Sequence, residues 1–219
     1  HGLFRDVFTG VDTRQKKAIP IGELHILLNK DPQSEKLRRT QAIANLLFQF
    51  CGMPFSDLAH LEKSNLERGL LKYNRTKTGT PMSIEVLESA QNAIGGLYNK
   101  SDARSSGYPD YLFRILSGAY KRNEEGAYRE YQSALRRFNN ELKSLSRKLR
   151  ISSSVTSYTL RHSWATTAKY RGVPIEMISE SLGHKSIKTT QIYLKGFELE
   201  ERTKVNKLNY SYVCNFKML

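Results

Sequence analysis

Three short segments in the last third of the chain contain side chains that could act together on an anionic group. TLRHSWAT spans residues 159–166, LGH spans 182–184 and TTQIY spans 189–193. Arg161 precedes His184 by 23 residues, and His184 precedes Tyr193 by nine. A guanidinium binds phosphate oxygens in pairs, an imidazole can donate a hydrogen bond or transfer a proton, and a tyrosine hydroxyl can be a nucleophile. The three segments therefore indicate chemistry at a phosphate.

These segments and their spacing resemble the catalytic boxes of the tyrosine recombinases, also called the phage integrase family. The likeness is greatest to the integrases of conjugative transposons, and it extends over roughly residues 18–200. It implies a mainly α-helical catalytic domain with a small antiparallel β-sheet, an α+β fold that clamps duplex DNA. It implies no metal and no nucleotide cofactor.

The resemblance also assigns roles to individual residues. Tyr193 would attack the scissile phosphate and form a 3′-phosphotyrosyl bond, while Arg161 and His184 would stabilise the charge that develops on the phosphate oxygens. Lys77, in the turn Thr76-Lys77-Thr78-Gly79, would be the general acid for the 5′-hydroxyl. A lysine in a turn is otherwise a solvated residue. His162 is expected to support the site from behind, and Trp164 is expected to pack near Arg161 and not to touch DNA.

The sequence departs from the family pattern at two positions. Cys51 stands where we expect the first catalytic arginine, and a neutral thiol cannot bind a phosphate oxygen by charge. Losing one such donor costs about 3–4 kcal/mol of transition-state stabilisation. Arg38, Arg39 and Arg75 are conceivable substitutes. Tyr158 stands at the usual histidine position, where its hydroxyl can still form a hydrogen bond.

Hydrophobic periodicity predicts the elements that must position these residues. Leu70–Arg75 and Met82–Val86 read as two strands of a hairpin with Lys77 near its tip, and Ser56 or Asp57 is a candidate cap for a short helix before them. A short turn or helix is expected at 111–116 and a loop at 101–107. Further helices are expected at about 20–29, 34–51, 87–98, 157–171, 174–182 and 186–194.

The longest periodic stretch predicts one helix with a buried face and a basic stripe. Its apolar positions step by three and four from Tyr128 through Tyr131, Leu135, Phe138, Leu142 and Leu145 to Leu149. Arg129, Arg136, Lys143 and Arg150 step by seven along another face. This stripe is either a solvated surface or a track for the DNA backbone. The expected DNA-binding residues are Arg75, Lys77, Arg129, Arg136 and Lys143.

Composition limits the class of partner. The 219 residues include 35 Lys and Arg against 21 Asp and Glu, a formal net charge of +14, which favours polyanions such as double-stranded DNA. Cys51 and Cys214 are too few and too far apart for a disulfide scaffold or a cysteine-rich zinc site. The most apolar stretch, Ala42–Met53, is shorter than a membrane span. We therefore expect a cytoplasmic protein with no membrane partner.

The domain organisation follows from the same resemblance. Residues 1–17 are expected to be a linker after a missing core-binding domain, 18–200 the catalytic domain, and 201–219 a tail that docks in cis or on a neighbouring protomer. The recombinase would act as a homotetramer on two synapsed attachment sites, with this fragment alone a monomer. Two other functions remain open: a DNA-binding relative whose catalysis is impaired by Cys51, and a type IB topoisomerase, which the LGH to TTQIY segment disfavours.

Overall fold

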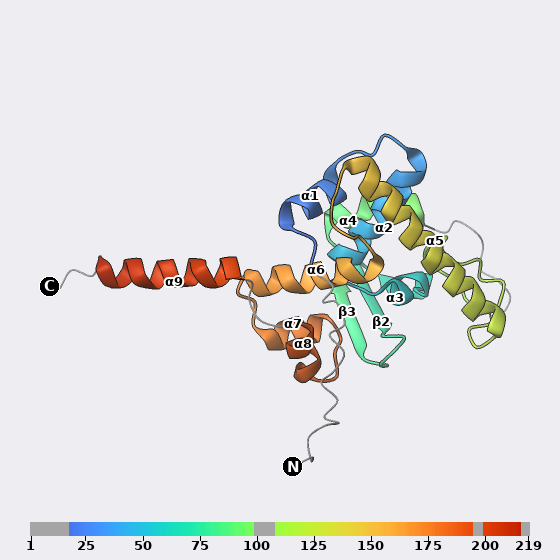
Figure 1. Ribbon diagram of the computed structural model, residues 1–219. Coiled ribbons are helices and arrows are strands. Elements are labelled where there is room, and N and C mark those ends of the chain that lie inside the picture. The colour runs from blue at the N-terminus through green and yellow to red at the C-terminus, as the bar shows by residue number, and fades with distance from the viewer. Residues whose placement is uncertain (1–17, 99–107, 195–198, 216–219) are drawn as a thin grey trace, which may run out of the picture.

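The computed structural model describes residues 18–98, 108–194 and 199–215, and it has the predicted mainly helical fold with one small antiparallel sheet (Figure 1). The helices are α1 (Ile21–Asn29), α2 (Glu35–Gln49), α3 (Phe55–Ala59), α4 (Glu88–Leu97), α5 (Glu125–Leu149), α6 (Ser157–Tyr170), α7 (Ile175–Ser181), α8 (Ile187–Tyr193) and α9 (Leu199–Cys214). The strands are β1 (Leu66–Glu67), β2 (Leu70–Asn74) and β3 (Pro81–Glu85). The predicted linker at 1–17 and loop at 101–107 lie outside the described residues.

Helix α2 lies at the centre of the main core. It packs against α4, α5 and α6, and its buried positions Leu46 and Leu47 are almost fully enclosed. Leu142 and Leu145 of α5 and Leu160 of α6 belong to the same cluster. The three- and four-residue spacing of these apolar positions gives each helix one buried face. The core therefore fixes the start of α6, which carries Arg161.

A second, smaller cluster holds α7 and α8 against α6. It consists of Ala165, Ile178, Leu182 and Leu194, with Trp164 packed against it. Trp164 is half-buried against this cluster, and its expected place near Arg161 and away from DNA stays a prediction. Figure 1 shows α7 and α8 together on one side of α6. This cluster places the loop that contains His184 next to the middle of α6.

The sheet has strand order β1-β2-β3, and each adjacent pair is antiparallel. The hairpin of β2 and β3 agrees with the prediction, whereas β1 has only two residues and its periodicity cannot be read from the sequence. Leu71, Tyr73 and Arg75 alternate with exposed residues, so the inner face of β2 continues to Arg75. Hydrogen bonds between Arg75 and Thr80 and from Gly79 to Arg75 close the hairpin loop.

Two local expectations were wrong, and a third was met in part. Pro54 is the N-cap of α3, with no side-chain cap, because Ser56 and Asp57 lie inside the helix and Asp57 is turned toward Arg75. The expected turn or helix at 111–116 is a turn at 114–115 and not a helix, and the residues before it make isolated β-bridges, Glu62 to Tyr111 and Tyr98 to Phe113. Tyr128 is 64% exposed, because the core beneath α5 does not extend to the first turn of that helix.

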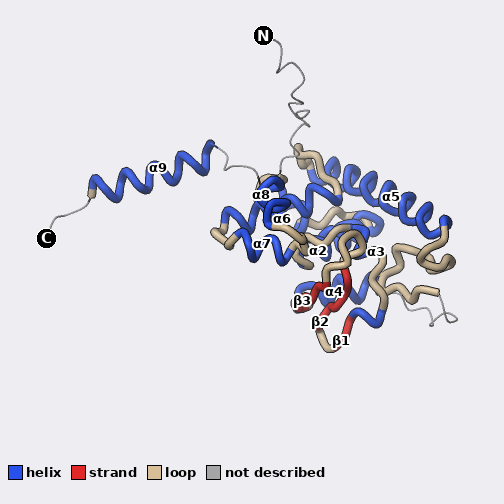
Figure 2. Tube along the Cα trace, turned by 90° about the horizontal axis from the view of Figure 1, so that it is seen from below, coloured by secondary structure: helices blue, strands red, loops and turns tan. Residues whose placement is uncertain are grey.

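Helix α9 projects away from the rest of the molecule in both views (Figures 1 and 2). Val205, Leu208, Tyr210 and Val213 on it are each more than half exposed. Within the described ranges, no helix is both long enough and apolar enough to cross a bilayer.

Candidate active site

Arg161 joins three separate segments at the centre of the site. Thr156 is the N-cap of helix α6, its side chain accepts a hydrogen bond from the backbone N–H of Thr159, and Arg161 follows in the second turn. Its Nη1 donates to the Gly52 carbonyl at 2.8 Å, and its Nη2 donates to the Leu182 carbonyl at 2.7 Å. The guanidinium is thus held rigidly, with only 7% of the residue exposed.

His184 lies between Arg161 and helix α8. Its Nε2 is 3.2 Å from Arg161 Nη2, and its Nδ1 is 2.8 Å from the Thr190 hydroxyl. Because arginine only donates, Nε2 accepts this hydrogen bond and Nδ1 carries the proton. Burial, followed by the charges of Arg161 and Arg75, lowers the pKa of His184 to about 4. The imidazole is therefore neutral at pH 7, with Nε2 able to accept a proton.

Two glycines allow the backbone to approach these side chains. Gly52 has a φ of 64°, and a Cβ there would lie 3.1 Å from Trp164 Cβ and 3.4 Å from Arg161 Cα. Gly183 has a φ of 63°, and a Cβ there would lie 2.8 Å from Met82 Sδ and 3.0 Å from Arg75 Cγ. Both conformations are left-handed, which favours glycine. The G of the LGH segment therefore both turns the chain toward His184 and leaves room for Arg75.

Arg75 enters the site from the hairpin. Its Nε is 2.8 Å from Asp57 Oδ2, in an ion pair whose N–H is not aligned as a hydrogen bond. Its Nη1 donates to the carbonyls of Leu182 and Gly183, the latter at 3.3 Å. Asp57 Oδ1 accepts from the backbone N–H of Thr76 at 3.1 Å. Arg75 was expected among the DNA-binding residues and as one of three conceivable substitutes for the missing arginine, and it lies beside Arg161 with 7% of the residue exposed.

The remaining candidates are positioned as follows. Cys51 is half-buried with a φ of 55°, and burial raises the pKa of its thiol, so it is neutral. Lys77 is exposed in the hairpin turn and Tyr158 is 44% exposed in the first turn of α6. His162 is half-buried, and burial lowers its pKa. Tyr193 is the last residue of α8, and its side chain lies outside the described part of the chain.

Other contacts fix the backbone that carries Tyr193. Thr190, the partner of His184, is fully buried and lies one helical turn before Tyr193 in α8. Lys169 Nζ of α6 donates to the Leu194 carbonyl at 3.1 Å. Thr190 and Lys169 were not predicted as site residues, and Asp57 was expected only as a candidate helix cap. Threonine and lysine are too common for their types to reveal such roles, and the Asp57 contact depends on tertiary packing.

The basic stripe of α5 lies on the protein surface. Arg129, Arg136, Lys143 and Arg150 are all exposed, and Arg129 forms an ion pair with Glu125 at 2.6 Å. Since an exposed i,i+4 pair contributes little to stability, this contact does not prevent Arg129 from binding an anion. The stripe is compatible with either the solvated face or the DNA track.

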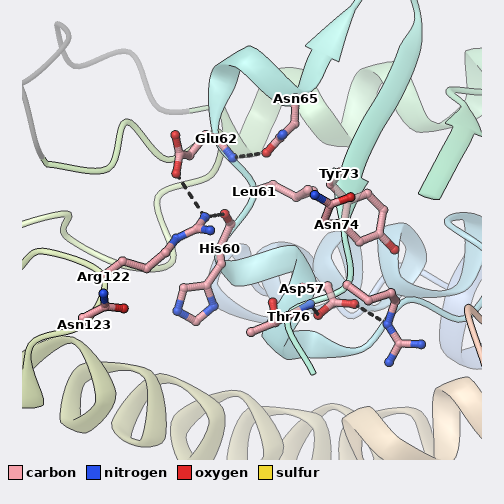
Figure 3. Close-up of a pocket in the computed structure, with 11 residues that line it drawn as sticks. Asp57, His60, Leu61, Glu62, Asn65, Tyr73, Asn74, Thr76, Arg122 and Asn123 are labelled. Atoms are coloured by element: carbon pink, nitrogen blue, oxygen red, sulfur yellow. Dashed lines mark hydrogen bonds and ion pairs between the residues drawn. The ribbon is translucent and has the colours of Figure 1, made fainter. Parts of the chain in front are cut away.

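A cavity of about 540 Å³ adjoins the Asp57 and Arg75 pair (Figure 3). His60, Glu62, Tyr73 and Arg122 line it, and Arg122 donates to the His60 carbonyl and to Glu62. Burial, followed by the charge of Asp57, raises the pKa of Tyr73, which is therefore a neutral wall of the cavity. No group of three or more His, Cys, Asp or Glu side chains within the described ranges could hold a metal ion.

The chain is similar to known recombinases over most of its length. The model of the phage integrase family matches residues 22–199. A tyrosine recombinase of Thermosipho africanus is 36% identical over 186 residues, which are 85% of this chain and 59% of that protein. A probable integrase/recombinase of Methanocaldococcus jannaschii is 28% identical over 204 residues, 90% of this chain and 58% of that protein. This chain thus spans under three fifths of the length of these relatives.

Solved structures agree with the fold. XerA recombinase has a TM-score of 0.62 at 21% identity, covering 96% of this chain and 68% of that one. The integrase of transposon Tn1549, solved with a circular intermediate DNA, has a TM-score of 0.61 at 16% identity, covering 90% of this chain and 67% of that one. With the match of the family model, these comparisons establish that the chain belongs to the phage integrase family and contains the catalytic domain of a tyrosine recombinase.

Proposed function

We propose that this protein is a site-specific DNA recombinase of a mobile element, which cleaves and rejoins duplex DNA through a 3′-phosphotyrosyl intermediate. The observation that carries this proposal is the chain of contacts from Arg161 to His184 and from His184 to Thr190 in the helix that ends at Tyr193. Membership of the phage integrase family supports the same chemistry.

In the proposed mechanism, Tyr193 is the nucleophile. Its hydroxyl attacks the scissile phosphorus, a P–O bond to the tyrosine forms, and the bond to the 5′-oxygen breaks. Arg161 stabilises the charge on the non-bridging oxygens. Because the new bond is a phosphodiester, a second 5′-hydroxyl can reverse the step and rejoin DNA without an external energy source.

Two proton transfers accompany this exchange. His184 Nε2, the acceptor of an Arg161 hydrogen bond, takes the phenol proton once the phosphate engages that arginine. The neutral state of His184 supports acceptance of a proton over donation to the phosphate. Lys77 gives a proton to the leaving 5′-oxygen; its exposure at the hairpin turn leaves it accessible to DNA laid across the site.

The proposed assembly is a homotetramer on two synapsed double-stranded DNA sites, with the isolated chain a monomer. The exposed apolar residues of α9 support docking of the C-terminal segment on a neighbouring protomer. The net charge of +14 supports DNA as the partner. The mobile-element assignment is supported by the fold it shares with the Tn1549 integrase.

Covalent trapping tests the proposal. The protein is incubated with a nicked duplex that carries the end of its element, and a denaturant-resistant protein–DNA adduct is measured for wild type and Tyr193→Phe. We expect an adduct with wild type and none with Tyr193→Phe. An adduct of equal yield in the variant would exclude Tyr193 as the nucleophile.

The alternative is a DNA-binding protein of the same fold with impaired catalysis. The neutral thiol of Cys51 favours it, because a cation is expected at that position. If wild type binds DNA without forming an adduct and Cys51→Arg forms one, the alternative is correct. If wild type relaxes any supercoiled plasmid and never recombines paired sites, the protein is instead a topoisomerase.

A further inference from the structure

Two arginines converge on one backbone oxygen at the centre of the site. Arg161 Nη2 and Arg75 Nη1 both donate to the carbonyl of Leu182, although Arg161 lies in helix α6 and Arg75 directly follows strand β2. Each is 7% exposed. A shared acceptor brings the guanidinium groups next to each other, an arrangement that is electrostatically unfavourable unless negative charge is also present.

Among the residues that the structure describes, Asp57 is the carboxylate paired with this cluster. Asp57, with a fully buried side chain, faces Arg75 at 2.8 Å. His184 and Cys51 are neutral at pH 7, because the pKa of the first is lowered and that of the second is raised. Arg75, Arg161 and Asp57 together therefore carry one net positive charge. One phosphodiester anion would neutralise this cluster.

Arg75 also has donor capacity left for a ligand. A guanidinium has five N–H groups. Nε faces Asp57 and Nη1 faces the carbonyls of Leu182 and Gly183, whereas Nη2 has no hydrogen-bond partner among the residues that the structure describes. The other two conceivable substitutes bind other groups. Arg38 binds Asp31 and Glu35, and Arg39 donates to the Arg114 carbonyl.

We propose that Arg75 supplies the second phosphate-binding guanidinium of the active site, in place of the arginine that is absent at Cys51. Asp57 is its positioning residue, since it also binds the backbone of Thr76 and so fixes the base of the hairpin. Gly183 makes the position possible, because a side chain there would collide with Arg75. This inference rests on the proposed function and explains how the chemistry can persist with a neutral residue at 51.

A neutral substrate separates an electrostatic role from a structural one. A methylphosphonate has a methyl group in place of one non-bridging oxygen and is therefore neutral. If Arg75 stabilises the negative charge of the phosphate, this substrate removes the charge with which Arg75 interacts. We expect Arg75→Ala to lose about 100- to 1000-fold in cleavage of the normal phosphate. On the methylphosphonate, the same variant should cleave within about tenfold of wild type. The assay measures all cleaved strands, both those still bonded to the protein and those released by hydrolysis of the protein–DNA adduct.

Arg68→Ala, which removes an arginine with a 91% exposed side chain, is the matched control and should behave as wild type on both substrates. If Arg75→Ala does not fold, Arg75→Lys, which keeps the charge, takes its place. Its loss of cleavage on the normal phosphate is then compared with its loss on the methylphosphonate. An equal defect of a folded variant on both substrates would overturn the inference and leave the proposed function intact. Absence of cleavage by wild type on both substrates would instead overturn the proposed function.

Discussion

At the scale of single residues, the site depends on backbone positions as much as on side chains. Gly52 and Gly183 adopt left-handed conformations directly beside Arg161 and Arg75. The carbonyls of Gly52, Leu182 and Gly183 accept the arginine hydrogen bonds. Main-chain acceptors cannot be exchanged by mutation, so the glycines that shape this backbone are the sensitive positions.

Gly183→Ala should lower both stability and activity. Its φ of 63° is strained for alanine, and the new methyl would lie 2.8 Å from Met82 Sδ and 3.0 Å from Arg75. Gly172→Ala has a similar φ of 77° but meets no atom within 4 Å, so it shares only the backbone cost of about 1–3 kcal/mol. Urea denaturation and strand cleavage should show a larger loss for Gly183→Ala. Equal losses would mean that the close approach to Arg75 is unimportant.

His184 should make the protein less stable in acid. Its pKa is about 4 in the folded protein, against 6.5 for an unperturbed histidine, so between these values the unfolded chain binds more protons than the folded one. The free energy of unfolding therefore falls as the pH decreases from about 6.5 to about 4. Chemical denaturation at several pH values should show a weaker fall in His184→Gln. A fall of the same size in that variant would assign the effect to other groups.

At the scale of elements, the hairpin brings two different cations to the site. Arg75 at the end of its buried face lies under Gly183, while Lys77, two residues later, lies in the exposed turn. The ion pair with Asp57 and the hydrogen bond from Thr76 to Asp57 connect the hairpin to α3. The hairpin can therefore position both residues only while it remains attached to α3.

Lys77 is predicted to matter only when the leaving oxygen needs a proton. Lys77→Ala should reduce cleavage of normal DNA by about 100- to 10,000-fold, the usual contribution of a general acid. A substrate with sulfur at the 5′-bridging position should restore the rate, because a thiolate is a far better leaving group than an alkoxide. Lys72→Ala, on the same hairpin and also exposed, is the control. A defect that persists with the sulfur substrate would make Lys77 a DNA-binding residue.

Asp57→Asn is predicted to destabilise the protein strongly. It leaves the buried Arg75 without its carboxylate, a change that typically costs about 3–5 kcal/mol. Asp31→Asn is the matched control, since Asp31 also binds an arginine, at 3.0 Å, but on the surface. Its effect in urea denaturation should be much smaller. Comparable effects of the two substitutions would show that the Asp57 pair is not a structural contact of the hairpin.

At the scale of the whole molecule, the net charge of +14 predicts DNA binding that weakens steeply with salt. If the stripe on α5 contacts DNA, Arg136→Gln with Lys143→Gln should reduce the slope of log affinity against log salt by about 1.8. Lys30→Gln with Lys36→Gln removes the same charge from exposed positions at the end of α1 and the start of α2 and should change the slope little. Equal changes in the two double variants, measured by fluorescence anisotropy, would identify the stripe as a solvated face.

Much of this molecule could be predicted from local sequence. The periodicities that predicted α2, α5 and the hairpin of β2 and β3 are properties of neighbouring residues, and the structure contains these elements. The LRHSWAT, LGH and TTQIY segments indicated the family, which the comparisons establish. The two-residue strand β1 and the β-bridges of Tyr111 and Phe113 were missed because their conformation depends on distant strand partners.

Only the tertiary structure decided where Arg75 lies. By type and position it was one of several surface cations, and three arginines were conceivable substitutes at the site. Its contacts with Asp57, Leu182 and Gly183 span separations from 18 to 108 residues along the chain. Burial of an arginine requires a carboxylate and carbonyl oxygens at matching positions. Those partners meet only when the hairpin, α3 and the loop after α7 pack together, which no local pattern records.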